Sequence, residues 1–147
     1  MQNAQCRRAM SPLRHALGAV AIAAIALCRS ASAQAVHVVR LEVDPAEDIH
    51  RFVPARVTAK AGDVIRFRVV SGAPHSIAFQ GSSLSQAARE ALNAAMPSRT
   101  GDLSGPVLAA NGAEYRIVVP ALPPGRYVFF SLPHRAYEME GELLVVK

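Results

Sequence analysis

Residues 131–141 read SLPHRAYEMEG and lie between two short apolar segments near the end of the chain. The segments on either side, 127–131 and 142–146, are rich in aromatic or aliphatic side chains and have the length of strands in a sheet. The stretch therefore predicts a strand, a short loop and a final strand. The loop holds His134 and Met139, and imidazole and thioether side chains both bind copper. We therefore take this loop as the candidate functional site.

Upstream of the loop, short apolar segments alternate with turn signals. Gly62-Asp63 and Asn111-Gly112 are the clearest turns. A bulge near Arg66 is expected, because Val64, Phe67 and Val69 do not share one face of a regular strand. The segments that predict strands are residues 36–43, 52–63 (a strand with its turn), 64–70, 75–79, 106–108, 114–119, 127–131 and 142–146.

Residues 83–96 change to a helical period, and we expect one inserted helix there. Ser83 and Gln86 have the spacing of a capping box at its start, and Pro97 follows its end. No internal repeat and no second domain are evident. Together these patterns predict an all-β protein, a Greek-key β-sandwich of about seven to eight strands with one helix that packs on it.

The candidate loop resembles the ligand loop of the cupredoxins, the family of plastocyanin and azurin. That loop reads Cys-x-Pro-His, four residues, Met and often x-Gly, and Pro133-His134, Met139 and Gly141 stand at the matching positions. His75 follows a short loop, as the first histidine ligand of that family does. The resemblance implies one copper ion held by His75, His134 and Met139, a role in electron transfer, and a redox or copper-handling protein as partner.

Ser131 stands where the cupredoxin loop has its cysteine ligand. A blue-copper site needs two imidazoles, a thiolate and a weak axial thioether, and a neutral hydroxyl is a poor copper ligand. We therefore expect an altered, non-blue site suited to copper binding or carriage. Two alternatives stay open: a metal-free cupredoxin scaffold that acts as a protein-interaction module, or another metal such as zinc, against which the methionine argues.

Residues 1–33 have the features of a secretory signal peptide. Arg7, Arg8 and Arg14 precede an apolar segment at 17–27, which is too short to span a bilayer, and Ala31-Ser32-Ala33 is a small-x-small cleavage site. The expected mature domain is residues 34–147, without a membrane span, in the periplasm or secreted. Both cysteines, Cys6 and Cys28, lie in the leader, so the mature domain can form no disulfide.

Other classes of function find little support in the sequence. Most of the formal charge of +5 belongs to the leader, and no basic stripe with interleaved aromatics indicates nucleic-acid binding. No general base or nucleophile elbow accompanies Ser131 and His134, so we expect no enzyme. His37 and His50 match no motif, and we expect ordinary surface or hydrogen-bonded histidines there. A monomer is expected.

Overall fold

The computed structural model describes residues 33–147, so all of the predicted signal peptide but its last residue, including Cys6 and Cys28, lies outside the described residues. Within residues 33–147 the chain forms eight strands, one α-helix and one 3₁₀ helix. In chain order they are β1 (Val36–Asp44), β2 (Ile49–Val53), β3 (Arg56–Ala59), β4 (Val64–Val69), β5 (Ala78–Phe79), α1 (Gln86–Ala95), β6 (Glu114–Val118), β7 (Gly125–Phe130), η1 (Leu132–Tyr137) and β8 (Glu140–Val145).

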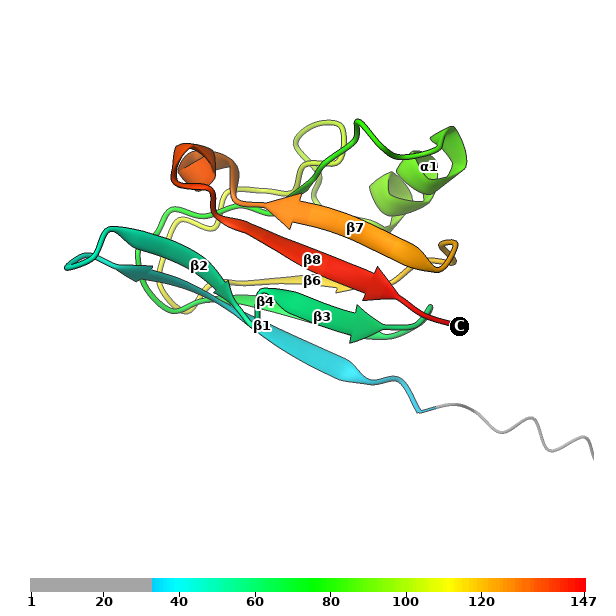
Figure 1. Cartoon of the computed structure of the whole chain (residues 1–147), viewed down its shortest axis with the longest axis horizontal. Coiled ribbons are helices and arrows are strands. Elements are labelled where there is room, and N and C mark those ends of the chain that lie inside the picture. Colours follow the sequence, from blue (N-terminus) through cyan, green and yellow to red (C-terminus); the bar gives the residue numbers. More distant parts are fainter. Residues whose placement is uncertain (1–32) are drawn as a thin grey trace, which may run out of the picture. The chain divides into compact units, whose positions relative to one another are not determined.

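The strands form two four-stranded sheets that pack face to face (Figure 1). The first sheet has the order β2-β1-β4-β6 and the second has the order β3-β8-β7-β5. Most neighbours are antiparallel, but β1 pairs with β4 and β3 pairs with β8 in parallel. The expected β-sandwich of seven to eight strands with one helix is therefore confirmed.

Aromatic side chains from both sheets meet in the middle of the core. The Phe129 ring of β7 packs edge-on against Phe52, Phe67 and Phe79, with ring centres 4.9, 5.2 and 6.2 Å away. Such edge-to-face contacts add to the free energy of burying the rings themselves. Phe129 thus ties the second sheet to β2 and β4 of the first, and this packing sets how the strand ends meet at the candidate site.

The helix is present, but its predicted cap is wrong. α1 begins at Gln86, and the N-cap is Ser85, whose hydroxyl accepts a hydrogen bond from the Ala88 N–H at 3.2 Å. Ser83 lies outside the helix. The helix packs on the sandwich through Ala88 and Leu92, as expected. The Ser85 cap, rather than the Ser83–Gln86 spacing, therefore marks where the helix starts.

Two strand predictions also need correction. The expected bulge near Arg66 is absent, because β4 pairs without interruption with β1 and β6. Ile65, Phe67 and Val69 are its buried residues, so ordinary alternation explains the strand. Residues 106–108 form no strand, and only Leu108 makes an isolated bridge, which joins it to His75.

No helix among residues 33–147 combines the length and the apolar character that crossing a membrane requires.

Candidate metal centre

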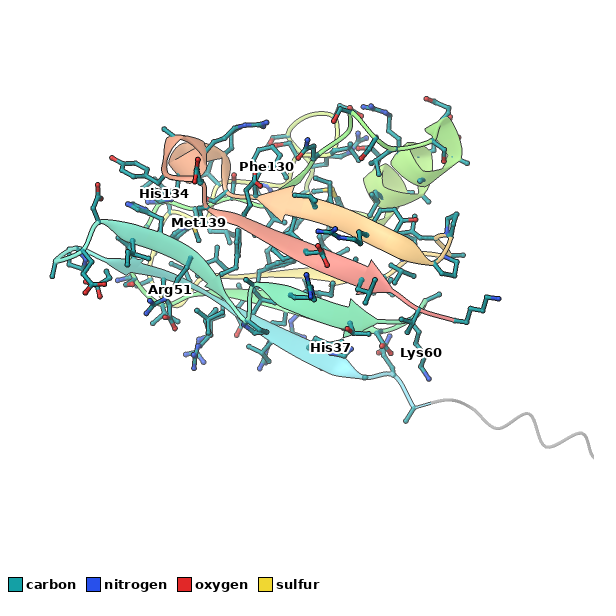
Figure 2. All side chains as sticks on the ribbon, viewed as in Figure 1. His37, Arg51, Lys60, Phe130, His134 and Met139 are labelled. Carbon is teal, nitrogen blue, oxygen red and sulfur yellow. The ribbon has the colours of Figure 1, made fainter. Side chains whose placement is uncertain are left out.

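The loop identified from the sequence folds as a tight connection between β7 and β8. Ser131 follows β7, and its backbone N–H donates to the Met139 carbonyl at 3.1 Å, which closes the loop. The His134 N–H donates to the Ser131 carbonyl at 3.1 Å and starts η1. Glu138 then takes a left-handed conformation with φ 55° and turns the chain into β8. His134 and Met139 consequently lie at the same end of the sandwich (Figure 2).

His75 reaches this end from the segment between β4 and β5. It is fully buried and sits in an antiparallel bridge with Leu108, outside the short strand β5. Its Nε2–H donates to the Ser71 carbonyl at 2.8 Å. Because a carbonyl can only accept, this contact leaves Nδ1 as the unprotonated nitrogen of the neutral ring. His75 therefore presents a lone pair on Nδ1, the form in which imidazole binds metals.

His134 faces His75 across the site. The centres of the two rings are 4.6 Å apart. The Nδ1 atom of His134 is buried and has no hydrogen-bond partner among residues 33–147. A buried polar atom without a partner is unusual and calls for an explanation. A role of this nitrogen as a metal ligand is one such explanation.

The pKa values of both histidines favour the neutral form. Burial is the first cause that lowers the pKa of His75, although its hydrogen bond to Ser71 opposes this. Burial also lowers the pKa of His134, and the neighbouring His75 and His50 add to the effect. Because a metal competes with protons for imidazole nitrogen, neutral rings are prepared for metal binding.

Ser131 occupies the remaining side of the site and is fully buried. Its Oγ lies 3.5 Å from His75 Nδ1, at the outer limit of a hydrogen bond. The Ser76 N–H donates to the same Oγ at 3.3 Å. The hydroxyl thus stands beside the imidazole nitrogen, where a cysteine at the same position would place its sulfur.

Met139, the last of the predicted ligands, is fully buried within the core next to the loop. The structure thus brings all four positions singled out from the sequence, His75, Ser131, His134 and Met139, to one end of the sandwich. Two imidazole nitrogens and a thioether are a donor set that fits copper, Cu(I) above all.

The structure adds His50, which sequence reasoning treated as an ordinary histidine. His50 does form a hydrogen bond, from Nε2 to the Asp48 carboxylate at 3.2 Å, but only 8% of its side chain is exposed and its ring centre lies 4.5 Å from that of His134. His50 pairs with Val43 in the β1–β2 ladder and lies two residues before the buried Phe52. Alternation from Phe52 would have placed it on the inner face, had residues 49–51 been recognised as strand.

His37, the other histidine treated as ordinary, does lie away from the site. Its Nε2 is 3.1 Å from the Asp63 carboxylate, in a contact that joins β1 to the turn before β4. It appears at the opposite end of the sandwich from His134 (Figure 2). That expectation is therefore confirmed for His37.

Acidic side chains do not complete the centre. Among the described residues, no group of three or more His, Cys, Asp or Glu side chains is arranged to hold a metal ion. A surface pocket of about 400 Å³ lies instead on β3, β7 and β8, where Arg126 donates to the Glu142 carboxylate at 2.6 Å. That pocket contains none of the candidate ligands.

Comparison with known proteins points to one family. The family described as copper-binding proteins of the plastocyanin/azurin type matches residues 38–146. Oxidised plastocyanin from Dryopteris crassirhizoma is 24% identical, with a TM-score of 0.58 over 74% of this chain and 99% of that one. A mutant fern plastocyanin is also 24% identical, with a TM-score of 0.57 over 74% of this chain and 99% of that one. An oxidised amicyanin mutant is 17% identical, with a TM-score of 0.53 over 76% of this chain and 82% of that one.

Proposed function

Because the chain belongs to the plastocyanin/azurin family of copper-binding proteins, we propose that it binds one copper ion through His75, His134 and Met139 after export to the periplasm or the medium. The family consists of electron carriers rather than enzymes, in agreement with the expectation that this chain is no enzyme.

One observation carries the proposal: two imidazoles lie side by side, His134 Nδ1 has no hydrogen-bond partner among residues 33–147, and His75 Nδ1 has only a 3.5 Å contact with Ser131 Oγ. Two rings whose nitrogens bind one copper at about 2 Å and at near-tetrahedral angles have centres about 5 Å apart. The His75 and His134 centres, 4.6 Å apart, meet this condition. A hydrogen bond to Ser71 fixes the tautomer of His75, and no competing partner engages His134 Nδ1.

Copper bound here would supply a one-electron couple between Cu(II) and Cu(I). His75, His134 and Met139 would favour the reduced ion, Cu(I), because two imidazoles and a buried thioether form a soft donor set of low charge. Without a thiolate at position 131, the chain lacks the short covalent bond of a blue site. Copper carriage therefore fits the chain better than rapid electron transfer.

A protein partner would meet the site at η1, where Leu132 and Tyr137 flank His134. These two apolar side chains are 55% and 49% exposed. A copper-handling or redox protein that docks on them would reach His134 first, since His75 is fully buried.

The test is a titration of the purified protein with Cu(I), Cu(II) and Zn(II), followed by calorimetry and by electron paramagnetic resonance of the Cu(II) form. We expect one tightly bound copper, weaker zinc, and no intense blue colour. His134→Ala and Met139→Leu should each weaken copper binding. His37→Ala is the matched control, because it removes a histidine far from the centre.

Either of two results would refute the proposal. Binding no tighter in the parent protein than in His134→Ala would mean that copper associates only with surface histidines. Tight binding that His37→Ala abolishes would place the site elsewhere. In the first case the metal-free interaction module would become the better account.

A further inference from the structure

The ring of His134 lacks the kind of anchor that holds His75. A hydrogen bond to Ser71 orients the His75 ring, whereas no hydrogen bond to any other part of residues 33–147 orients the His134 ring. His134 also lies in a short connection at the surface rather than inside a strand. Contacts with other rings must therefore set its orientation.

His50 supplies the closest of these contacts. Its ring centre lies 4.5 Å from that of His134 and 4.0 Å from that of Tyr137, nearly parallel to the latter at 22°. His134 lies at a kink inside η1, with φ −114° and ψ 24°, and its ring centre is 6.2 Å from that of Tyr137. His50 of β2 thus docks against the ring face of the loop that carries His134.

His50 itself is held in place from two sides. Its Nε2 lies 3.2 Å from the Asp48 carboxylate, to which it donates, and its backbone belongs to the β1–β2 ladder. With 8% of its side chain exposed, it has little freedom to turn. A strand residue therefore packs behind the candidate ligand on a short loop, and such support is what metal sites require of the residues behind their ligands.

We propose that His50 is a positioning residue: it holds the His134 ring in the orientation that copper binding needs. Its consequence for copper rests on the function proposed above, but its effect on the His134 ring does not. The Nδ1 atom of His50, like that of His134, is buried without a hydrogen-bond partner among residues 33–147, so the experiment must separate a positioning role from a ligand role.

The experiment compares His50→Ala, which removes the ring, with His50→Phe, which keeps a ring of similar size and no nitrogen. His37→Ala serves as the control, and denaturant unfolding shows that each variant is folded. The first readout is nuclear magnetic resonance of the metal-free protein, with the His134 side chain labelled, to measure the order of its ring. The second is the copper affinity together with the Cu(II) paramagnetic resonance spectrum.

We expect His50→Ala to disorder the His134 ring and to lower the copper affinity about tenfold or more, the usual effect of losing a residue that supports a ligand. His50→Phe should restore both, with the spectrum of the parent protein. An ordered ring and unchanged affinity in His50→Ala would overturn the proposal. The proposal would also be overturned if His50→Phe bound copper as weakly as His50→Ala and its Cu(II) spectrum showed one nitrogen ligand fewer than that of the parent protein. His50 would then be a ligand.

Failure of the proposed function gives a different result. If the parent protein does not bind copper, the affinity measurement shows no difference among the variants. The order of the His134 ring still falls in His50→Ala if His50 positions that ring. A ring that is equally ordered in both metal-free proteins would overturn the positioning role on its own.

Discussion

Ser131 is the residue at which the copper chemistry is decided. Its Oγ is buried 3.5 Å from His75 Nδ1, and cysteine is nearly isosteric with serine. We expect Ser131→Cys to fold normally and, once loaded with Cu(II), to gain the intense blue absorption of a copper–thiolate bond, because the thiolate would complete the two-imidazole, one-thioether set. Absorption spectroscopy of both proteins is the measurement. A blue parent protein, or a colourless copper-loaded Ser131→Cys, would contradict the assignment of this position.

Gly141, next to the loop, has a packing role that its neighbours define. A Cβ at this position would overlap the Phe129 ring and lie 3.1 Å from the Ala55 carbonyl oxygen. We expect Gly141→Ala to lower the free energy of unfolding by about 1–3 kcal/mol, the usual cost of overpacking a core. Gly125→Ala is the control, since its nearest new contact would be 3.9 Å away. Equal denaturation midpoints for the two variants would contradict the expectation.

At the scale of elements, α1 shows a helix start set by one hydroxyl. Ser85 caps the Ala88 N–H at 3.2 Å, whereas Ser83 lies outside the helix. We expect Ser85→Ala to lower the free energy of unfolding by about 1 kcal/mol and Ser83→Ala to leave it nearly unchanged. Urea denaturation of both variants is the measurement, and the reverse order would restore the cap expected from the sequence.

For the whole molecule, Asp63 links the first strand to the turn before β4. Its buried carboxylate accepts hydrogen bonds from the Lys60 and Ala35 N–H groups at 3.1 and 3.2 Å and contacts His37. The Lys60 hydrogen bond is the first cause that lowers the pKa of Asp63, and the contact with His37 lowers it further. The stability that this carboxylate contributes is therefore fully present above its unfolded pKa of about 3.9 and is lost as the pH falls through the lower folded pKa.

We accordingly expect Asp63→Asn to be less stable than the parent near neutral pH and to lose less stability on acidification below about pH 4. The measurement is the free energy of unfolding from urea melts at several pH values. Glu47→Gln, at an exposed turn position, is the matched control and should follow the parent curve. Parallel acid limbs for Asp63→Asn and the parent would contradict the role of Asp63.

By itself, the sequence determined the features that depend on local spacing. Alternation of apolar residues indicated a sandwich, and the interval from Pro133-His134 to Met139 and Gly141 indicated the site, because a short loop between two strands must keep its residues together. The sequence also shows directly that position 131 is a serine and not a cysteine, and reading this requires no knowledge of packing.

Tertiary structure alone decided the features that depend on partners far apart in the chain. His50 reaches His134 because β2 pairs with β1 and then faces η1, and no local pattern encodes that docking. Phe129 likewise meets Phe52 and Phe67 only when the two sheets pack on each other. In both cases contacts between distant parts of the chain decided the outcome, since burial and ring contacts are settled only when the sheets close on each other.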